Sequence, residues 1–581
     1  MVKLLRVNLT DGTSRDEVVP DEIVRRYVGS KGIGTHYLLE EVPADADPLG
    51  PQNKLILSCG PLSGSAMPGS NRYAAYFISP LTGGYGEAYS GGNVATQFAR
   101  TGYRMVIVEG RAPTPVFLEV SEEGASIHPA DDVWGLGIYD AEPALLEKVG
   151  VKGARAAVIG PAGEKLVRFA CIINDHTHAL GRGGAGAVAG SKNLKGVVWH
   201  GSRTPEVARP VELKALVKEM AGICKDHPSV LAYGRMGTVQ MVRVTNELDM
   251  FPTRYWQKGR LEGWEDALHP DVMVERYKVK NTTCPPCLIQ CGNLCRVPSG
   301  PLEGLEIEPE FETIYAFGGL CEIPDLAQVM RMNEICDRLG VDTMTAGNLC
   351  ALAIEATRQG KLDAGVDYGD ADGVAAFLEG MCLRSTKLGD VFAEGVLEVE
   401  RRFGLKGLAV HVKGMEPAGY DPRRSKGMGL GYAMSERGAC HMRATFMKAE
   451  LSGLIDIDQI EGKGTMYVDW ENRFVLMDCM IFCRFYRDML DREFLTRIVN
   501  AAVGLDDDPD ELWAKANAIV TETHEVNRRR GFGPEQESLP SWITEHAIIA
   551  KDGSELRFTH EMQEAMRREY YMARGWGEPS S

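Results

Sequence analysis

Short apolar runs alternate with turn-forming residues over roughly the first 205 positions of the chain. The runs LLRVNL, KLILS, YAAYFI, RMVIVEG, VFLEV and AAVIG have the length and the β-branched content of strands. Glycine-dense stretches at 29–34, 83–92 and 181–190 fall between these runs and predict loops. The pattern therefore predicts a sheet-rich domain over residues 1–205, and it shows no short internal repeat.

After residue 205 the apolar spacing changes to that of amphipathic helices. Residues 211–227, 325–340 and 345–360 carry apolar side chains three and four positions apart. The segment 374–404 predicts two further helices, and 510–532 predicts another. The predicted fold class is α+β, in which the sheet-rich domain 1–205 precedes two mainly α-helical domains, 206–410 and 411–581.

Composition narrows the class of protein without identifying it. The chain has 581 residues, of which 44% are hydrophobic and 25% charged, as in ordinary globular proteins. Its net charge is −17 and no basic stripe interrupts the acidity, so we expect no nucleic-acid partner. Lys3, Arg6 and Asp11 break the first apolar stretch, so we expect no signal peptide. No run of 18 apolar residues occurs, so we expect no membrane span and a cytoplasmic location.

Most of the fourteen cysteines are scattered, as buried core thiols are, but two places are not: Cys284 to Cys295, and Cys479 with Cys483. Cys284, Cys287 and Cys291 follow one another at short spacing, and clustered thiolates bind iron–sulfur clusters or zinc. No second cysteine pair follows at the spacing of a zinc finger, which favours an iron–sulfur cluster. A four-iron cluster needs a fourth ligand, and the spacing leaves both Cys295 and Cys483 open.

The glycine-dense stretches also suggest an anionic ligand. Clustered backbone N–H groups bind phosphates, and Arg72 and Arg182 place guanidinium groups among them. The sequence GAGAVA at 184–189 imitates a dinucleotide fingerprint, but it follows a polar stretch and lacks the acidic partner. The sequence thus predicts a phosphate-bearing cofactor beside the cluster, with tight turns of a β domain as the simpler explanation of each glycine run.

Seven ordered blocks resemble the tungsten-containing aldehyde:ferredoxin oxidoreductases along nearly the whole chain. They are RYVGSKGIGTHYLLEE, CGPLSGSAMPGSNRYAAYFISPLTGGYGEAYSGG, GRGGAGAVAGSKNLKGVV, CPPCLIQC, LGVDTMTAGN, HVKGMEPAGYDPR and GMGLGYAMSERGACHMRAT. In the third block Ala189 replaces a methionine of the family signature.

This resemblance implies that the N-terminal domain cradles a bis-pyranopterin (molybdopterin) cofactor that holds tungsten or molybdenum. A Mg²⁺ ion would bridge the pterin phosphates through the carbonyls of Tyr89, where the family often has Asn, and Ala179. The other cofactor-binding residues that the resemblance implies are Arg72, Arg182, Gly183, Gly184, Asp342, Arg443 and Asp478. From its local pattern alone, Asp342 would be a turn or cap residue.

The resemblance also selects among the cysteines. It implies a [4Fe-4S] cluster on Cys284, Cys287, Cys291 and Cys483, although Ile481 occupies a position where the family has glycine. Cys295 and Cys479 would then be extra thiols.

The implied activity is the oxidation of aldehydes to carboxylic acids, with electrons passing through the cluster to ferredoxin or to a partner subunit. His441 and Glu312 would be the catalytic acid/base groups, although an isolated histidine of this kind is more often a satisfied core residue. Cys440 is either a metal ligand or a buried thiol. The alternatives are the catalytic subunit of a complex such as an aromatic acyl-CoA reductase and a zinc-stabilised scaffold without activity. A homodimer or a hetero-oligomer fits either enzyme, and the lack of histidine between His269 and His411 predicts that a dimer-bridging metal site is absent.

Overall fold

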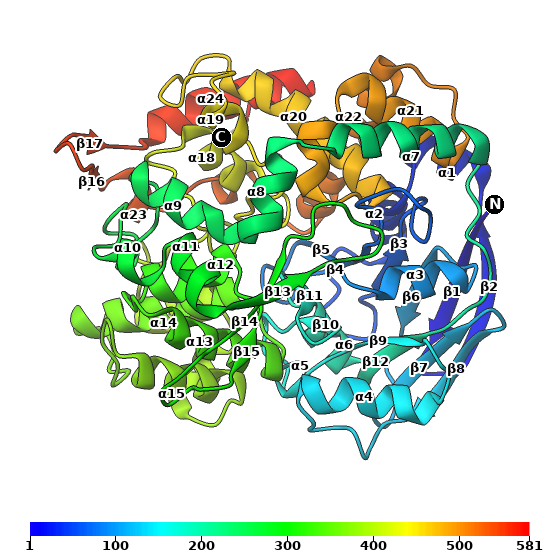
Figure 1. Cartoon of the computed structure of the whole chain (residues 1–581), viewed down its shortest axis with the longest axis horizontal. Helices are drawn as coiled ribbons and strands as arrows, with labels where there is room; N and C mark the ends of the chain where they lie inside the picture. Colours follow the sequence, from blue (N-terminus) through cyan, green and yellow to red (C-terminus); the bar gives the residue numbers. More distant parts are fainter. Residues whose placement is uncertain (580–581) are drawn as a thin grey trace.

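The computed structural model describes residues 1–579, and its first third contains two six-stranded sheets (Figure 1). The first sheet consists of β1 (Val2–Asn8), β2 (Thr13–Val19), β3 (Leu55–Cys59), β4 (Tyr73–Ile78), β5 (Tyr85–Ser90) and β6 (Met105–Glu109). The second consists of β7 (Val116–Ser121), β8 (Gly124–Pro129), β9 (Arg155–Val158), β10 (Ile172–Asn174), β11 (His178–Leu180) and β12 (Leu194–Trp199).

The two sheets repeat one topology. Their strand orders are β2-β1-β6-β3-β4-β5 and β8-β7-β12-β9-β10-β11, so each strand of the first has a counterpart six strands later. In both sheets only the first and last strands of the set, β1 with β6 and β7 with β12, pair in parallel. A Gly-Pro pair follows both β3 and β9, at Gly60 and Gly160. The N-terminal part is therefore an internal duplication, whose sequences have diverged too far to show as a short repeat.

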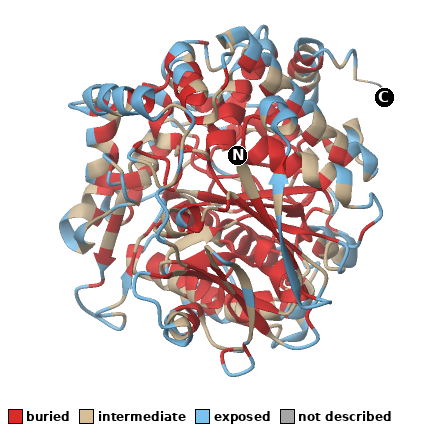
Figure 2. Cartoon of the chain, turned by 90° about the vertical axis from the view of Figure 1, so that its right-hand side faces the viewer, coloured by how far each residue is buried: buried red, intermediate tan, exposed pale blue. Residues whose placement is uncertain are grey.

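The sheets pack face to face because their side chains alternate between two apolar cores. Leu5 and Leu57 point into the core between the sheets, whereas their neighbours Leu4 and Ile56 point to the opposite face of the first sheet. That opposite face packs against helices from the C-terminal part, and α4 (Ile138–Val149) covers the outer face of the second sheet. The central strands of both sheets are consequently buried on both sides, whereas the edge strands β2 and β8 are partly exposed (Figure 2).

The rest of the chain is mainly helical, which confirms the predicted fold class. Within the sheet region lie α1 (Asp21–Tyr27), α2 (Ser30–Glu41), α3 (Val94–Arg100), α5 (Pro161–Glu164) and α6 (Ala185–Ser191). The middle part contains α7 (Pro210–Cys224), α8 (Pro228–Met236), η1 (Gly237–Val239), α9 (Gln240–Glu247), α10 (Trp264–Ala267), α11 (Pro270–Val272), η2 (Met273–Tyr277), α12 (Phe311–Thr313), η3 (Ile314–Gly319), α13 (Leu326–Leu339), α14 (Thr343–Arg358), α15 (Ala371–Cys382), α16 (Lys387–Phe392) and α17 (Val396–Phe403), with a small sheet of β13 (Lys278–Thr282), β14 (Gly292–Arg296) and β15 (Glu306–Ile307).

The C-terminal part contains α18 (Lys426–Met434), α19 (Met447–Leu451), α20 (Lys463–Met480), η4 (Arg484–Met489), α21 (Arg492–Val503), α22 (Pro509–Arg529), η5 (Pro534–Gln536), α23 (Ser541–Thr544), the hairpin of β16 (Ile548–Ile549) and β17 (Glu555–Leu556), and α24 (His560–Arg574). Within residues 1–579, the apolar length of every helix falls short of what a membrane crossing requires.

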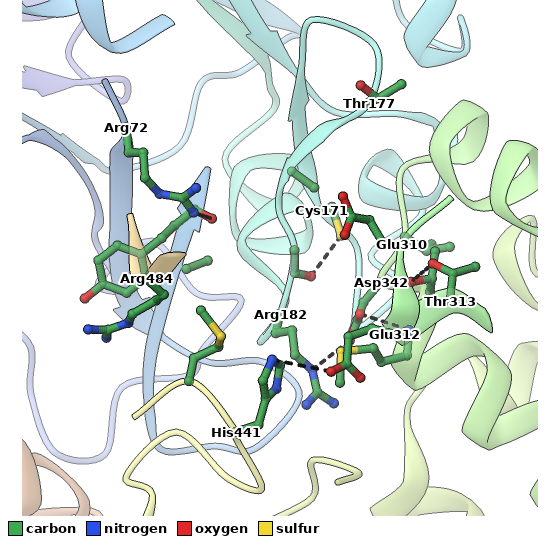
Figure 3. A pocket seen from close by; sticks show the side chains of 18 of the residues that line it. Arg72, Cys171, Thr177, Arg182, Glu310, Glu312, Thr313, Asp342, His441 and Arg484 are labelled. Atoms are coloured by element: carbon green, nitrogen blue, oxygen red, sulfur yellow. Dashed lines mark hydrogen bonds and ion pairs between the residues drawn. The ribbon is translucent and has the colours of Figure 1, made fainter. Parts of the chain in front are cut away.

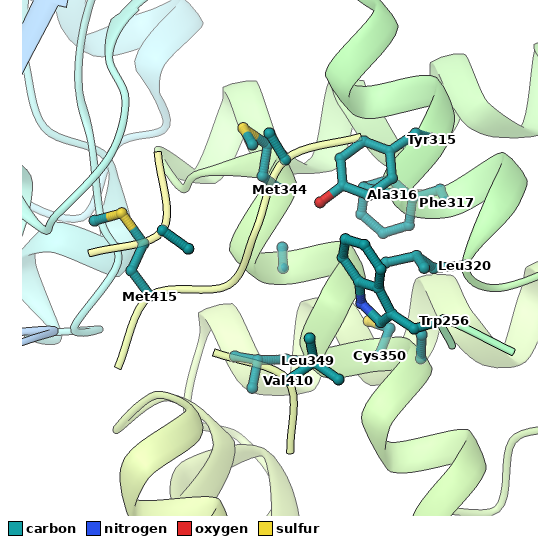
Figure 4. Close-up of a cluster of buried hydrophobic side chains, with 14 of the residues drawn as sticks. Trp256, Tyr315, Ala316, Phe317, Leu320, Met344, Leu349, Cys350, Val410 and Met415 are labelled. Carbon is teal, nitrogen blue, oxygen red and sulfur yellow. The ribbon is translucent and has the colours of Figure 1, made fainter. Parts of the chain in front are cut away.

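One large core holds the middle and C-terminal parts together (Figure 4). Its aromatic members satisfy their polar atoms internally. Trp256 Nε1 donates to Asn348 Oδ1 at 3.2 Å, and the Tyr315 hydroxyl donates to the Pro417 carbonyl at 2.5 Å. These bonds fix η3, a π-helix that begins two residues after Glu312, against α14.

Two sequence predictions about elements were wrong. The segment 374–404 contains parts of three helices, α15, α16 and α17, rather than two. The glycine-dense stretches at 29–34, 83–92 and 181–190 are mostly not loops, because they contain the start of α2, the strand β5 and most of α6. Their glycines allow close packing: a Cβ on Gly34 would overlap the Tyr76 ring, and one on Gly186 would overlap the Cys171 carbonyl.

Candidate active site

A cavity of about 280 Å³ lies where the two sheets meet the helical parts, and most of the predicted site residues line it (Figure 3). The predicted residues in its wall are Arg72, Tyr89, Ala179, Arg182, Glu312, Asp342, His441, Arg443 and Asp478. Gly183 and Gly184 lie beside the cavity but not in its wall. Both have φ near +90°, so glycine at these two positions serves the turn that leads into α6.

Tyr89 and Ala179 occupy equivalent places in the two sheets. Gly60 and Gly160 give the alignment of the two sheets. The strand residues two positions before these glycines, Ser58 and Val158, are therefore equivalent. Ser58 pairs with Ala74, which pairs with Tyr89; Val158 pairs with Ile173, which pairs with Ala179. The duplication thus brings two matched backbone positions to one cavity, and Arg72 Nη2 donates to the Tyr89 carbonyl at 3.3 Å.

Five arginines line this cavity, namely Arg72, Arg182, Arg437, Arg443 and Arg484. Arg443 and Arg484 share one carboxylate, since their guanidinium nitrogens lie 2.8 and 2.6 Å from Asp478 Oδ2. The Nε atoms of Arg437 and Arg443 are buried and have no partner among the described residues. Five guanidinium groups therefore surround one cavity, and guanidinium groups bind phosphate and carboxylate oxygens.

Arg182 is held at the opposite wall. Its Nε lies 3.0 Å from Asp342 Oδ2, and its Nη2 donates to the Glu416 carbonyl at 2.8 Å. Asp342 is also the N-cap of α14, where it accepts from the backbone of Met344 and Thr345. Asp342 therefore has both roles: it caps α14, as its local pattern predicts, and it lies in the cavity wall.

His441 and Glu312 face each other, with Nε2 and Oε1 3.4 Å apart. Glu312 Oε2 accepts from the backbone N–H of Gly419 at 3.0 Å, while His441 Nδ1 is buried and has no partner among the described residues. Burial and the nearby Arg182 hold the pKa of His441 well below its usual range. Burial raises the pKa of Glu312 to about 8, so near neutral pH the pair carries its proton on the carboxyl group.

The same cause favours the protonated form of two further acidic side chains in the wall. Burial raises the pKa of Glu310 to about 7 and that of Asp337 well above its ordinary value. Asp342 and Asp478 remain paired with arginines. The arginines therefore dominate the charge of the cavity, which favours an anionic ligand.

A second cavity, of about 200 Å³, contains four cysteines. Cys284, Cys287, Cys291 and Cys483 line it, although Cys483 comes from the segment after α20, far along the chain. Cys295 lies in β14, fully buried in the large core, and does not line this cavity. The geometry therefore groups Cys483 rather than Cys295 with the other three.

The two cavities are neighbours. Arg72 and Glu310 line both of them. These two side chains would therefore separate a group bound in the first cavity from a group bound in the second. His178 closes the second cavity, with its Nε2 3.6 Å from Cys284 Sγ.

Sequence reasoning missed Arg437 and Arg484 among the lining residues. A signal existed for both, because Arg437 lies in the same block as His441 and Arg484 directly follows Cys483. No signal existed for Glu87, a strand residue whose buried carboxylate forms ion pairs with Lys31 and Arg443. These three residues come together only because α2 and the segment between α18 and α19, which contains Arg443, pack against β5.

Cys440 does not line the cavity. Its buried sulfur accepts from Arg437 Nη2 at 2.8 Å and from the backbone N–H of Met442 at 3.3 Å. Although burial opposes ionisation, Arg437 and Arg443 lower the pKa of Cys440 to about 7. This geometry fits the buried thiol better than the metal ligand among the two expectations.

The site thus consists of two adjoining cavities, one lined by five arginines and the other by four cysteines. Two family models, "Aldehyde ferredoxin oxidoreductase, N-terminal domain" and "Aldehyde ferredoxin oxidoreductase, domains 2 & 3", match residues 4–201 and 215–580. The chain belongs to the aldehyde ferredoxin oxidoreductase family.

Its relatives include the tungsten-containing aldehyde ferredoxin oxidoreductase of Pyrococcus abyssi, which is 34% identical over 99% of this chain and 96% of the relative. The WOR-like subunit of an aliphatic sulfonate oxidoreductase from Pyrococcus furiosus is 28% identical over 77% of this chain and 76% of its own length. Among solved structures, the active-site complex BamBC of benzoyl coenzyme A reductase has the same fold, with a TM-score of 0.82 at 21% identity over 99% of this chain and 94% of the other.

Proposed function

We propose that this protein oxidises aldehydes to carboxylic acids on a tungsten or molybdenum bis-pyranopterin and passes the electrons through a [4Fe-4S] cluster to ferredoxin or a partner subunit. The observation that carries the proposal is the pair of adjoining cavities, one dominated by arginines and the other lined by four cysteines. Relatives at 33–34% identity over nearly the whole chain are named for this activity.

The residues present fit the cofactor. The five arginines that line the first cavity suit phosphate oxygens, which guanidinium groups bind through charge-assisted hydrogen bonds. The equivalent carbonyls of Tyr89 and Ala179 suit a Mg²⁺ ion, which prefers oxygen ligands, between two matched halves of a cofactor. Four thiolates at Cys284, Cys287, Cys291 and Cys483 would complete the ligand set of a four-iron cluster.

When bound, such a metal–pterin centre supplies the two-electron chemistry, while the protein positions the substrate and moves protons. Oxidation of an aldehyde with water to a carboxylic acid releases two electrons and two protons, and these protons need an acceptor in the buried site. His441 and Glu312 both line the cavity, and the imidazole Nε2 lies 3.4 Å from a Glu312 carboxylate oxygen, so the pair can accept and move one of these protons. The arginines disfavour a lasting imidazolium, so Glu312 is the better resting place for the proton.

The test combines metal analysis with turnover. Protein made with tungstate or molybdate should contain about four iron atoms and one tungsten or molybdenum per chain, and it should reduce a dye when given an aldehyde. His441→Ala should keep both metals and lose about 10²–10⁴-fold in kcat. Iron-free protein that contains zinc would refute the proposal, and so would unchanged turnover in the variant.

The same assay separates the alternative, a catalytic subunit of an aromatic acyl-CoA reductase. The fold shared with the benzoyl coenzyme A reductase complex makes this comparison necessary. Loaded protein that fails with aldehydes, but oxidises a cyclic dienoyl-CoA to the aromatic thioester with a dye as acceptor, would replace the aldehyde proposal by the reductase.

A further inference from the structure

Two of the four cysteines in the second cavity are contacted by polar groups from outside the loop that carries them. Cys284 Sγ accepts from the backbone N–H of Gly92 at 3.1 Å and lies 3.6 Å from His178 Nε2. Cys287 Sγ lies 3.3 Å from the Tyr486 hydroxyl. These partners come from the segment after β5, from β11 and from η4, so the cysteine motif itself does not encode the contacts.

The neighbours of His178 decide which group donates in its contact with Cys284. A thiolate that binds iron carries no proton, so a hydrogen bond to it must come from the imidazole. The Thr177 hydroxyl lies 3.4 Å from His178 Nδ1 and can donate to it, which leaves the ring proton on Nε2. His178 Nε2–H therefore donates to Cys284 Sγ.

Gly91 provides the space for this arrangement. A Cβ at this position would lie 2.9 Å from Cys284 Sγ and 3.0 Å from His178 Cδ2. The same Cβ would lie 3.5 Å from Arg72 Nη1. Because Arg72 lines both cavities, Cys284 lies on the side of the cysteine cavity that faces the arginine cavity.

The Tyr486 hydroxyl is held in place by its own partners. It accepts from the backbone N–H of Leu288 at 2.9 Å, so its proton is available to Cys287 Sγ. The ring is buried, and a Cβ on Gly69 would overlap it. This close packing keeps the hydroxyl directed at the sulfur.

We propose that His178 and Tyr486 raise the reduction potential of the iron–sulfur cluster by donating hydrogen bonds to the sulfurs of Cys284 and Cys287. The inference rests on the proposed function, in which these cysteines hold a [4Fe-4S] cluster. Reduction adds one electron to the cluster, and no bond forms or breaks at either donor. Hydrogen bonds strengthen with the charge on the acceptor, so both donors stabilise the reduced state more than the oxidised state. The cluster thereby becomes a stronger acceptor for electrons from the first cavity.

The experiment measures the midpoint potential of the cluster in the metal-loaded protein. Dithionite titration with redox mediators sets the potential, and electron paramagnetic resonance detects the reduced cluster. His178→Leu and Tyr486→Phe each remove one donor and keep a side chain of similar size. We expect each change to lower the equilibrium constant for one-electron reduction about tenfold, which corresponds to a potential lower by about 59 mV.

Two further variants are matched controls. His178→Gln keeps a donor, because the glutamine amide nitrogen can occupy the place of Nε2 without an imidazole ring, so H178Q should keep the wild-type potential. His176→Leu removes an exposed histidine from the turn between β10 and β11 and should also leave the potential unchanged. All four variants should contain about four iron atoms per chain.

Wild-type potentials in H178L and Y486F would overturn the proposal, and a shift in only one of them would overturn the role of the other residue. An equally low potential in H178Q and H178L would show that the imidazole ring acts through its packing or charge and not through the hydrogen bond. Y486F removes a single oxygen atom, so it keeps the test decisive if leucine at position 178 lowers the iron content. Failure of the proposed function gives a different result, namely wild-type protein that contains no iron and shows no signal of a reduced cluster.

Discussion

At the scale of single residues, the site combines groups whose ionisation is controlled by burial. His441 is kept neutral, and Glu312 holds the proton that the imidazole cannot. The family resemblance implied both residues, but the sequence gave no reason why the pair should work together. That reason is the 3.4 Å approach of a carboxyl group and an imidazole in a cavity dominated by arginines.

The pKa of Glu312 predicts how turnover depends on pH. Because that pKa is raised to about 8, the carboxyl keeps its proton below about pH 8 and becomes a proton acceptor above it. We expect kcat to rise with pH up to about 8, by roughly tenfold per unit in its steepest part, and then to level off. Glu312→Gln should lose most turnover and retain a residual rate without this rise.

Glu310→Gln is the control, since Glu310 lines the same cavity and burial raises its pKa to about 7. Pre-steady-state reduction of the metal centre at several pH values would report the proton step directly. A residual rate in E312Q that still climbs towards pH 8 would show that another group accepts the proton.

The arrangement of the cysteines predicts which of them is the fourth cluster ligand. Sequence spacing left Cys295 and Cys483 open as the fourth ligand, and only Cys483 lines the cavity with Cys284, Cys287 and Cys291. Cys483→Ser should therefore reduce the iron content and the visible absorbance, whereas Cys295→Ser should keep about four iron atoms per chain. The opposite pattern would return the fourth position to Cys295.

At the scale of elements, strands were predicted from sequence better than glycine-rich segments. Runs such as KLILS and YAAYFI are strands because both faces of each sheet are buried, so a continuous apolar run suits them. The glycine runs were read as loops because glycine usually marks turns. At Gly34 and Gly186, glycine instead permits contacts with a tyrosine ring and a carbonyl group from segments that local sequence does not reveal.

Gly184, in the turn that leads into α6, is needed both for its backbone conformation and because a side chain there would have no room. Gly184 has φ +90°, and a Cβ there would overlap the Arg168 carbonyl oxygen, whereas Gly153 has φ +86° and nothing within 4 Å. Both Gly→Ala changes cost about 1–2 kcal/mol for the left-handed backbone. Only Gly184→Ala adds a steric clash with backbone, so its Tm should fall by several degrees more than that of Gly153→Ala in thermal scans at one heating rate.

G184A should also bind less tungsten or molybdenum per chain, because the same turn carries Arg182 into the cavity. Equal losses of Tm in the two variants would mean that conformation alone decides the role of this glycine.

At the scale of the whole molecule, the arrangement of layers explains why the site needs the full chain. The C-terminal helices cover the first sheet. The last turn of α20 supplies Asp478 to the first cavity, and the segment after α20 supplies Cys483 to the second. The sequence predicted the order of sheet and helical parts, but not that residues near 480 would lie against the glycines of the N-terminal sheet. A Cβ on Gly60 would overlap the Met480 carbonyl, a contact between segments about 400 positions apart that no local pattern encodes.

A buried polar cluster ties the last helices to the arginine side of the site. His524 of α22 places its Nδ1 3.0 Å from Glu436, the residue before Arg437, and 3.5 Å from Glu537. The Tyr571 hydroxyl of α24 donates to Glu537 at 2.5 Å, and the Trp576 ring stacks on His524 at 4.2 Å.

This cluster predicts a loss of stability on the alkaline side. Burial alone would lower the pKa of His524, but Glu436 and Glu537 outweigh it and raise the pKa, despite the opposing charge of Lys413. A histidine with a raised folded-state pKa stabilises fully below its ordinary value of about 6.5, and this contribution disappears as the pH rises through the raised value. The raised pKa of Glu537 acts in the same direction.

We therefore expect His524→Gln to unfold at a lower temperature than the wild type at pH 6, with the difference shrinking steadily towards pH 9. His560→Gln, at an exposed position in the first turn of α24, should follow the wild type at every pH. Thermal scans at one heating rate would measure both. A constant difference between H524Q and the wild type from pH 6 to pH 9 would mean that His524 acts through its packing against Trp576 and not through its charge.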